Sequence, residues 1–397
     1  MIYGFFNFFK NLKINNLFIK HNRFYFGEND IDNNNKILIE FNKFHTSHIP
    51  ISYLSNILAK KYNSKIEGFF NYSLISASLN NSLINKIKWK ISNFFSLNNF
   101  KIYRSFGTQN IFRPYKLSSN DKKSEKIYNN IYKNLKKKED IINIKFNKII
   151  VGDLIYDTYL KFYKEPTVEL NDLRFKRLLK DFIDLHFFWI DYLKKNKIKA
   201  IVGVHTPYSY GLILRIGVYK KIPTFITSSR FVYRLGKKMQ FMHGNFNDYP
   251  KVFKKLNKKN KIAAIKLAQK RLNLRFSGIS GAKADLITTE TSSFHKNKLP
   301  SIIKKNNRIK ILITPHDFFD AVHVFGKILF SDFYEWLIFL GKMSNETEYD
   351  WYIKNRPNYT GKFKVYQPLT NRIIKKIIKK YPKIKLIPNH YSHKQLM

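Results

Sequence analysis

The chain has 397 residues, 44% of them hydrophobic, and carries 73 lysines and arginines against 27 aspartates and glutamates. This length and apolar content suit two or three domains, each with a sizeable core. The absence of cysteine excludes disulfides and thiolate metal sites. No apolar stretch of about 18 residues is free of charge, so the sequence predicts no membrane-spanning segment and a cytoplasmic location.

The net charge of +46 has two interpretations. One is a nucleic-acid partner. The other is the codon usage of an AT-rich genome, which fits the abundance of Lys, Asn, Ile, Phe and Tyr and would scatter lysines over solvated faces. The lysine clusters at 136–138, 254–261 and 375–380 match no nucleic-acid motif. We therefore expect no specific nucleic-acid partner. We do expect peripheral contact with anionic lipid on the inner face of the cytoplasmic membrane.

Residues 1–35 are an N-terminal lead-in, a segment that precedes the first predicted strand of the fold. Their early aromatic run is broken by Lys10 and Lys13, and they lack the cleavage site of a secretory signal. Two interpretations stay open: an amphipathic segment on a membrane surface, or an irregular apolar lead-in.

Strands and helices alternate from residue 36 onward. Apolar runs predict strands at 36–41 and 65–70, with a helix at 47–62 between them. Residues 71–145 are less regular and contain a charged segment, 122–140, that predicts a solvated helix.

The pattern is clearer in the middle of the chain. It predicts a strand at 148–153, a helix at 171–195, a strand at 200–205, a helix at 209–221 and a strand at 223–227. Strand, helix and strand in such quick succession require a parallel sheet.

A basic helical region at about 250–276 is followed by a linker at 300–309, after which the alternation restarts. The further predictions are strands at 310–314, 350–355 and 385–388 and helices at 331–342, ending at Gly341, and 369–382. The sequence therefore predicts an α/β protein with two doubly wound parallel-sheet domains.

Ligands of such sheets lie beyond the carboxyl ends of the strands. Asp153 closes one predicted strand and shares a helical face with Asp157. This carboxylate pair either holds a metal or polar ligand, or consists of solvated and helix-capping side chains. His205 ends another strand, where it contacts an acceptor or phosphate, or bonds to a loop carbonyl.

A second polar cluster follows the strand at 310–314. His316, Asp317, Asp320 and His323 fall within eight residues. Histidines beside carboxylates suit acid–base work, a divalent ion or the lining of a cleft. We take His316, Asp317 and His205 as candidate catalytic residues and expect His316 to face His205. The motifs for cofactors and catalytic metals are absent, so we expect neither.

Four stretches, 152–163, 205–238, 275–278 and 315–354, resemble the bacterial capsule (surface) polysaccharide biosynthesis proteins, a broad glycosyltransferase class. The resemblance implies a Rossmann-like, glycosyltransferase-B-like architecture with an acceptor-side domain at 36–299 and a donor-side domain at 310–397. It also implies sugar transfer from a nucleotide sugar to a glycan or lipid-linked acceptor.

This chain departs from the family in two ways. It has Lys354-Asn355-Arg356-Pro357-Asn358 where the family has Lys-Thr-His-Pro-Asp, whose histidine contacts the donor nucleotide. We take Lys354 and Arg356 as the donor-binding candidates. The family pattern also continues past residue 397, so we expect an incomplete donor-side domain and impaired or absent transfer. The alternatives are a non-catalytic glycan- or partner-binding subunit and a basic RNA-associated protein.

Overall fold

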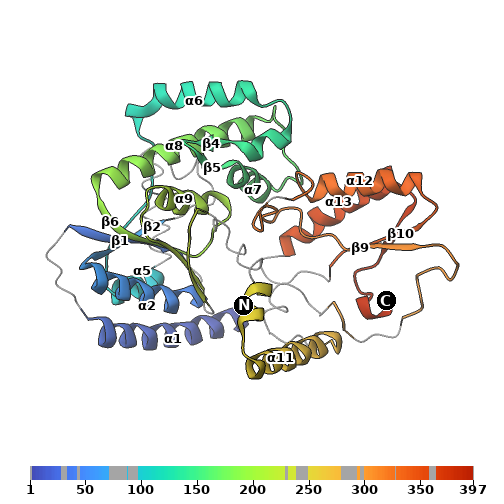
Figure 1. Cartoon of the computed structure of the whole chain (residues 1–397), viewed down its shortest axis with the longest axis horizontal. Coiled ribbons are helices and arrows are strands. Elements are labelled where there is room, and N and C mark those ends of the chain that lie inside the picture. Colours follow the sequence, from blue (N-terminus) through green and yellow to red (C-terminus); the bar gives the residue numbers. More distant parts are fainter. Residues whose placement is uncertain are drawn as a thin grey trace. The chain divides into compact units, whose positions relative to one another are not determined.

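The computed structural model (Figure 1) gives the fold of most of the chain. It describes residues 2–27, 34–42, 45–70, 87, 97–228, 231–237, 249–278, 293–295, 299–326, 328–356 and 364–396. Two compact units result. Unit 1 comprises Met1–Tyr163, Val168–Gly244 and His323–Lys327, and unit 2 comprises Lys164–Thr167, Asn245–Val322 and Ile328–Met397. The predicted linker at 300–309 thus falls inside unit 2.

Unit 1 is built on a six-stranded sheet in the order β3-β2-β1-β6-β7-β8. Its strands are β1 (Asn35–Phe41), β2 (Lys65–Phe70), β3 (Thr108–Phe112), β6 (Lys197–Gly203), β7 (Thr224–Ser228) and β8 (Phe231–Arg234). All neighbours pair in parallel except β7 and β8, which are antiparallel. The predicted parallel sheet is confirmed, while its two edge strands, β3 and β8, were not predicted.

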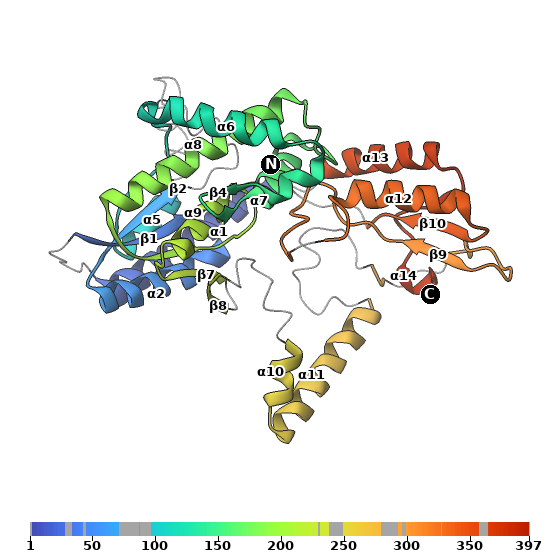
Figure 2. The ribbon, with the colours of Figure 1, turned by 45° about the horizontal axis from the view of Figure 1, so that its top comes forward.

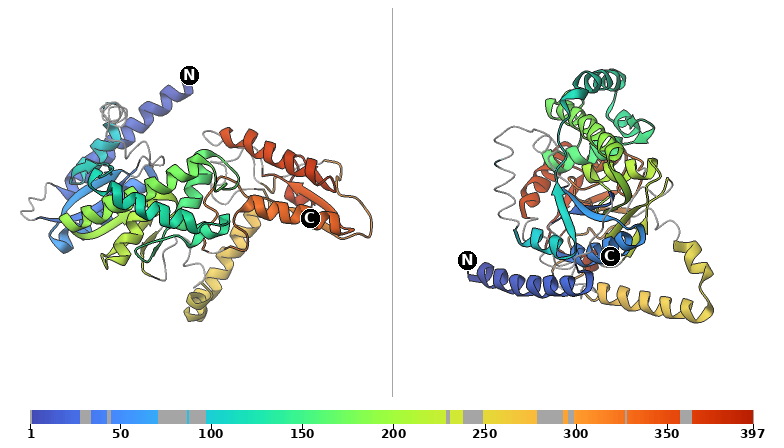
Figure 3. Two further views of the ribbon diagram at one scale, coloured as in Figure 1. Left: turned by 90° about the horizontal axis from the view of Figure 1, so that it is seen from above. Right: turned by 90° about the vertical axis from the view of Figure 1, so that its left-hand side faces the viewer.

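Helices cover both faces of this sheet (Figures 1 and 2). One layer contains α1 (Ile2–Phe26), α2 (His45–Tyr62) and α5 (Leu97–Ser105); the other contains α7 (Gly152–Tyr163), α8 (Leu173–Lys195) and α9 (Gly211–Tyr219). The amphipathic helix α6 (Asp121–Asn134) packs outside α8 (Figure 3). The short elements are η1 (Ser118–Asn120), η2 (Lys138–Asn143), η3 (Tyr208–Tyr210) and the antiparallel pair β4 (Lys145–Phe146) and β5 (Ile149–Ile150). This double covering matches the doubly wound prediction.

The start of the chain is helical, so the irregular lead-in is wrong. Phe18, Ile19 and Phe26 of α1 pack against the core under the sheet, and Asn22 donates to the Ser105 hydroxyl at 2.9 Å. Among the described helices, none is long and apolar enough to cross a bilayer.

The strand predicted at 148–153 is also wrong. Only Ile149 and Ile150 form a strand, in the β4–β5 hairpin, and α7 already begins at Gly152. A Cβ atom at Gly152 would lie 1.8 Å from the carbonyl oxygen of Ile141, so only glycine fits this close approach. Asp153 therefore lies in the first turn of a helix, where a carboxylate is favoured.

Unit 2 contains a three-stranded parallel sheet in the order β11-β10-β9. Its strands are β9 (Lys310–Ile313), β10 (Asp350–Lys354) and β11 (Ile384–Ile387); its helices are α10 (Tyr249–Lys255), α11 (Lys258–Phe276), α12 (Phe333–Glu346), α13 (Tyr366–Lys380) and α14 (His393–Leu396). Helices α12 and α13 lie on one face of the sheet (Figures 1 and 2). All three predicted strands are confirmed.

Helix α12 begins as predicted but continues past its predicted end. The Asp332 side chain caps it by accepting from the Glu335 backbone N–H at 2.8 Å. Gly341 lies inside the helix, where a Cβ atom would come within 2.3 Å of the Tyr381 ring. This glycine serves close packing against Tyr381, which follows α13, and does not terminate the helix.

Candidate functional site

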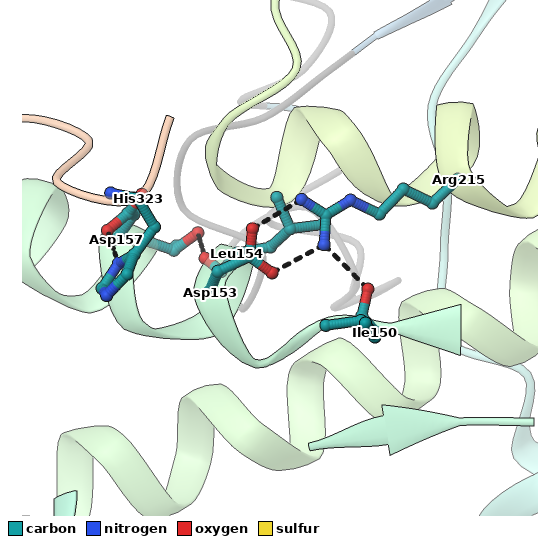
Figure 4. A network of polar contacts seen from close by, with 7 residues as sticks. Ile150, Asp153, Leu154, Asp157, Arg215 and His323 are labelled. Carbon is teal, nitrogen blue, oxygen red and sulfur yellow. Dashed lines mark hydrogen bonds and ion pairs between the residues drawn. The ribbon is translucent and has the colours of Figure 1, made fainter. Parts of the chain in front are cut away.

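The first aspartate of α7 forms a buried ion pair with a neighbouring helix (Figure 4). The guanidinium of Arg215, on α9, donates to both carboxylate oxygens of Asp153, at 2.6 and 2.5 Å. Its Nη1 also donates to the carbonyl oxygen of Ile150 at 2.8 Å. Both side chains are buried. Because two parallel hydrogen bonds join a planar fork to a carboxylate, the pair fixes the orientation of α9 against α7.

The second aspartate pairs with His323 (Figure 4). Nδ1 of His323 lies 2.7 Å from one oxygen of Asp157, and the backbone N–H of His323 donates to the other at 3.2 Å. Burial raises the pKa of Asp157 to about 6, although the charge and hydrogen bonds of His323 act in the opposite direction. The pair thus anchors the short segment 323–327 to α7 within unit 1.

These contacts contradict the interpretation of Asp153 and Asp157 as solvated or helix-capping side chains. Neither carboxylate is solvated or caps a helix, and each faces its own cationic or titratable partner. Among the residues that the structure describes, no group of three His, Cys, Asp or Glu side chains is placed to hold a metal. The network joins α7 to α9 through Arg215 and to the segment that begins at His323.

Sequence reasoning overlooked Arg215 and the partner role of His323. Arg215 is the only charged residue in the otherwise apolar helix α9. A charge on a buried helix face requires a partner, so this pattern was a usable signal. Its pairing with Asp153 depends on the packing of two helices and could not be found from spacing.

His205 lies two residues beyond the end of β6, so the carboxyl edge of the six-stranded sheet carries it. Its half-buried ring stacks on Tyr210, with centroids 6.4 Å apart. At the end of the adjacent strand β1, the buried Glu40 accepts a hydrogen bond from the Val204 backbone at 2.8 Å. Glu40 was missed because it lies within an apolar strand pattern. The two side chains make this edge a polar one.

The two candidate catalytic residues of unit 2 differ in exposure. His316 is exposed and its ring lies 5.3 Å from that of Phe333. Asp317 is buried and accepts from the Phe319 backbone N–H at 3.0 Å, which forms an Asx-type turn in its own loop. His205 belongs to unit 1 and His316 to unit 2, so their meeting remains a prediction.

The candidate donor-binding residue Lys354 has a buried side-chain amine. It ends β10, the central strand of the parallel sheet, and is 1% exposed. Its Nζ donates to the carbonyl oxygen of Asn355 at 3.2 Å, and among the described residues it forms no ion pair with a carboxylate. Burial lowers the pKa of Lys354 to about 8. The protein thus places a buried amine at the edge where ligands of parallel sheets bind.

The charge of Lys354 also acts on His393 of α14, which it helps to keep neutral. Burial lowers the pKa of His393 to about 4, and the positive charges of Lys354 and Arg275 lower it further. The side-chain oxygen of the buried Asn355 accepts from the backbone N–H of Arg356 at 2.9 Å. Its amide also donates to Asn371 at 3.3 Å. This carboxyl edge therefore favours an anionic ligand.

Comparison with known proteins gives no further identification. No protein-family model, no curated protein and no solved structure matches the chain significantly. The resemblance to capsule polysaccharide biosynthesis proteins remains a prediction from the sequence.

Proposed function

We propose that the chain binds a nucleotide-activated sugar, with the phosphates of the donor at the carboxyl edge of β10. It is then a glycosyltransferase-B-like protein of surface-polysaccharide biosynthesis acting on a glycan or lipid-linked acceptor. One observation carries the proposal: Lys354 is buried at this edge, and the described residues offer it no carboxylate.

Burying the ammonium group of Lys354 costs free energy. An unpaired charge that is removed from water destabilises the fold. An apolar residue at the end of the strand would avoid this cost. A phosphate oxygen that approached Nζ would supply the missing counter-charge in a site of low dielectric constant, where the attraction is strong. The cost of burial in the free protein is thereby offset on binding.

The chain's own residues have separate roles in this proposal. Lys354 holds the charge of the phosphates, and Asn355 positions it through the carbonyl that accepts from Nζ. Arg356 stands where the family has the nucleotide-contacting histidine and supplies a second cation. His316 and Asp317 follow β9, the strand beside β10, and are the proposed acid–base residues. Neither a metal nor a cofactor is required by this arrangement.

The experiment measures the thermal stability of the full chain with and without uridine diphosphate or guanosine diphosphate. We expect the nucleotides to raise the Tm of the wild type and of Lys376→Met, an exposed lysine on α13. Lys354→Met should show no shift. A shift that survives in Lys354→Met would refute binding at this edge. Assays of nucleotide-sugar hydrolysis and transfer then distinguish an enzyme from a binding subunit.

A further inference from the structure

Helices α10 and α11 carry the most one-sided charge of the described helices. Residues 249–276 contain eight lysines, two arginines and no acidic residue. None of these cations forms an ion pair with another residue in the described part of the chain. On α6, by contrast, Glu125 pairs with Lys180 at 2.9 Å. The lysines and arginines of α10 and α11 thus form a local concentration of positive charge.

The same two helices expose apolar side chains. Neither contains a buried residue. Ile262 and Ile265 are each 47% exposed and Leu272 is 51% exposed, and the three lie on one face of α11 at spacings of three and seven residues. Val252 of α10 is 56% exposed. Leu267, 52% exposed, lies on another face of α11, so aliphatic side chains and lysines are interleaved around the helix and both are available to a membrane interface.

We propose that α10 and α11 form a docking surface for an anionic lipid bilayer. The lysines contact lipid phosphates, and Ile262, Ile265 and Leu272 enter the boundary between the head groups and the acyl chains. The inference does not depend on the proposed sugar chemistry at Lys354.

The side chains favour lipid over two other occupants. Nucleic acid also offers phosphates, but it has no apolar phase to receive isoleucine and leucine. Lysine also outnumbers arginine on these helices, and arginine is the residue suited to bidentate recognition of phosphates and bases. A second copy of the chain would bring two surfaces of like charge together. A bilayer with anionic head groups satisfies both the charge and the apolar stripe.

The first test is sedimentation of the full chain with vesicles of phosphatidylcholine, alone or mixed with phosphatidylglycerol. We expect binding to the mixed vesicles only. Replacing Lys254, Lys255, Lys258 and Lys261 together by glutamine should weaken it on the order of 1,000-fold. The matched control replaces Lys375, Lys376, Lys379 and Lys380 of α13, which are also exposed, and should change binding little. Equal losses in both variants would overturn the proposal in favour of general adsorption.

The second test locates the apolar contact. Because the chain has no cysteine, Leu272→Cys and Lys376→Cys each provide a single site for an environment-sensitive dye. On anionic vesicles the dye at 272 should shift to shorter wavelength, whereas the dye at 376 should not. No shift at 272, or displacement of the vesicles by mixed RNA that binds more tightly at physiological salt, would contradict lipid docking. Circular dichroism of each variant checks that the fold is kept.

Discussion

At the scale of single residues, Lys354 is expected to lower stability while it supports binding. Its pKa of about 8 lies below the 10.5 of an ordinary lysine. The folded state therefore loses its proton first, and the free energy of unfolding rises as the pH goes from 8 to 10.5. At pH 7, Lys354→Met should raise that free energy by about 1–3 kcal/mol in urea denaturation. Lys376→Met is the control, and a destabilised Lys354→Met would contradict the buried-charge account.

The Asp153–Arg215 pair makes the opposite prediction. Arg215→Leu leaves the Asp153 carboxylate buried without its cation, so it should cost about 3–5 kcal/mol of unfolding free energy. The double variant Asp153→Leu, Arg215→Leu should be far less destabilised than the sum of the two single variants. Additive losses would show that the pair is not coupled as the 2.5 and 2.6 Å contacts indicate.

At the scale of elements, helix α8 contains the half-buried Asp181 and the buried His186, whose pKa values are shifted in opposite directions. Burial, with the charge of Asp184, raises the pKa of Asp181 to about 7, so its contribution to stability is lost between about pH 4 and 7 as the pH rises. Burial lowers the pKa of His186 to about 4, so its contribution is lost as the pH falls from 6.5 to 4.

Substitutions on α8 separate the two effects. Asp181→Asn should raise the free energy of unfolding above pH 7 by about 1–3 kcal/mol and leave it unchanged near pH 3. His186→Gln should flatten the loss of stability between pH 6.5 and 4. Denaturation curves across this pH range check both, and an unchanged profile in Asp181→Asn would show that Asp181 is solvated.

The elements also show what periodicity can predict. The three- and four-residue spacing of Leu178, Phe182, Leu185 and Trp189 is typical of one buried helix face, and all four are buried on α8. The errors at Gly152 and Gly341 have a common cause. Each glycine permits a close contact with a residue that is distant in sequence: Ile141 for Gly152 and Tyr381 for Gly341. The sequence shows where a glycine lies, but it does not show which residue packs against that glycine in the fold.

At the scale of the whole molecule, the parallel sheets followed from the alternation of strands and helices, whereas most polar partnerships did not. Asp153 and Arg215 are 62 positions apart, and Asp157 and His323 are 166 apart. Such pairs depend on how helices pack on a sheet, which is a tertiary property. Lys354 was singled out through the resemblance to the Lys-Thr-His-Pro-Asp pattern of the family, but its burial without a described counter-ion became visible only in the structure.

The net charge of +46 predicts electrostatic, non-specific binding to nucleic acid. We expect binding to mixed RNA to be independent of sequence and to weaken steeply as salt rises, because it rests on counterion release. Filter binding at increasing potassium chloride measures this dependence. Tight, sequence-selective binding at physiological salt would instead favour an RNA-associated protein.

The central claim is that Lys354 provides the charge for a phosphate-bearing ligand at the carboxyl edge of β10. Calorimetric titration of the full chain with uridine diphosphate or guanosine diphosphate, from pH 7 to 9.5, tests it most directly. The affinity should be steady below pH 8 and fall by up to about tenfold per pH unit above it, since only the protonated amine binds well. Lys354→Met should bind weakly with no such fall. Nucleotide binding in the wild type that is insensitive to pH across this range, and equal in Lys354→Met, would contradict the claim.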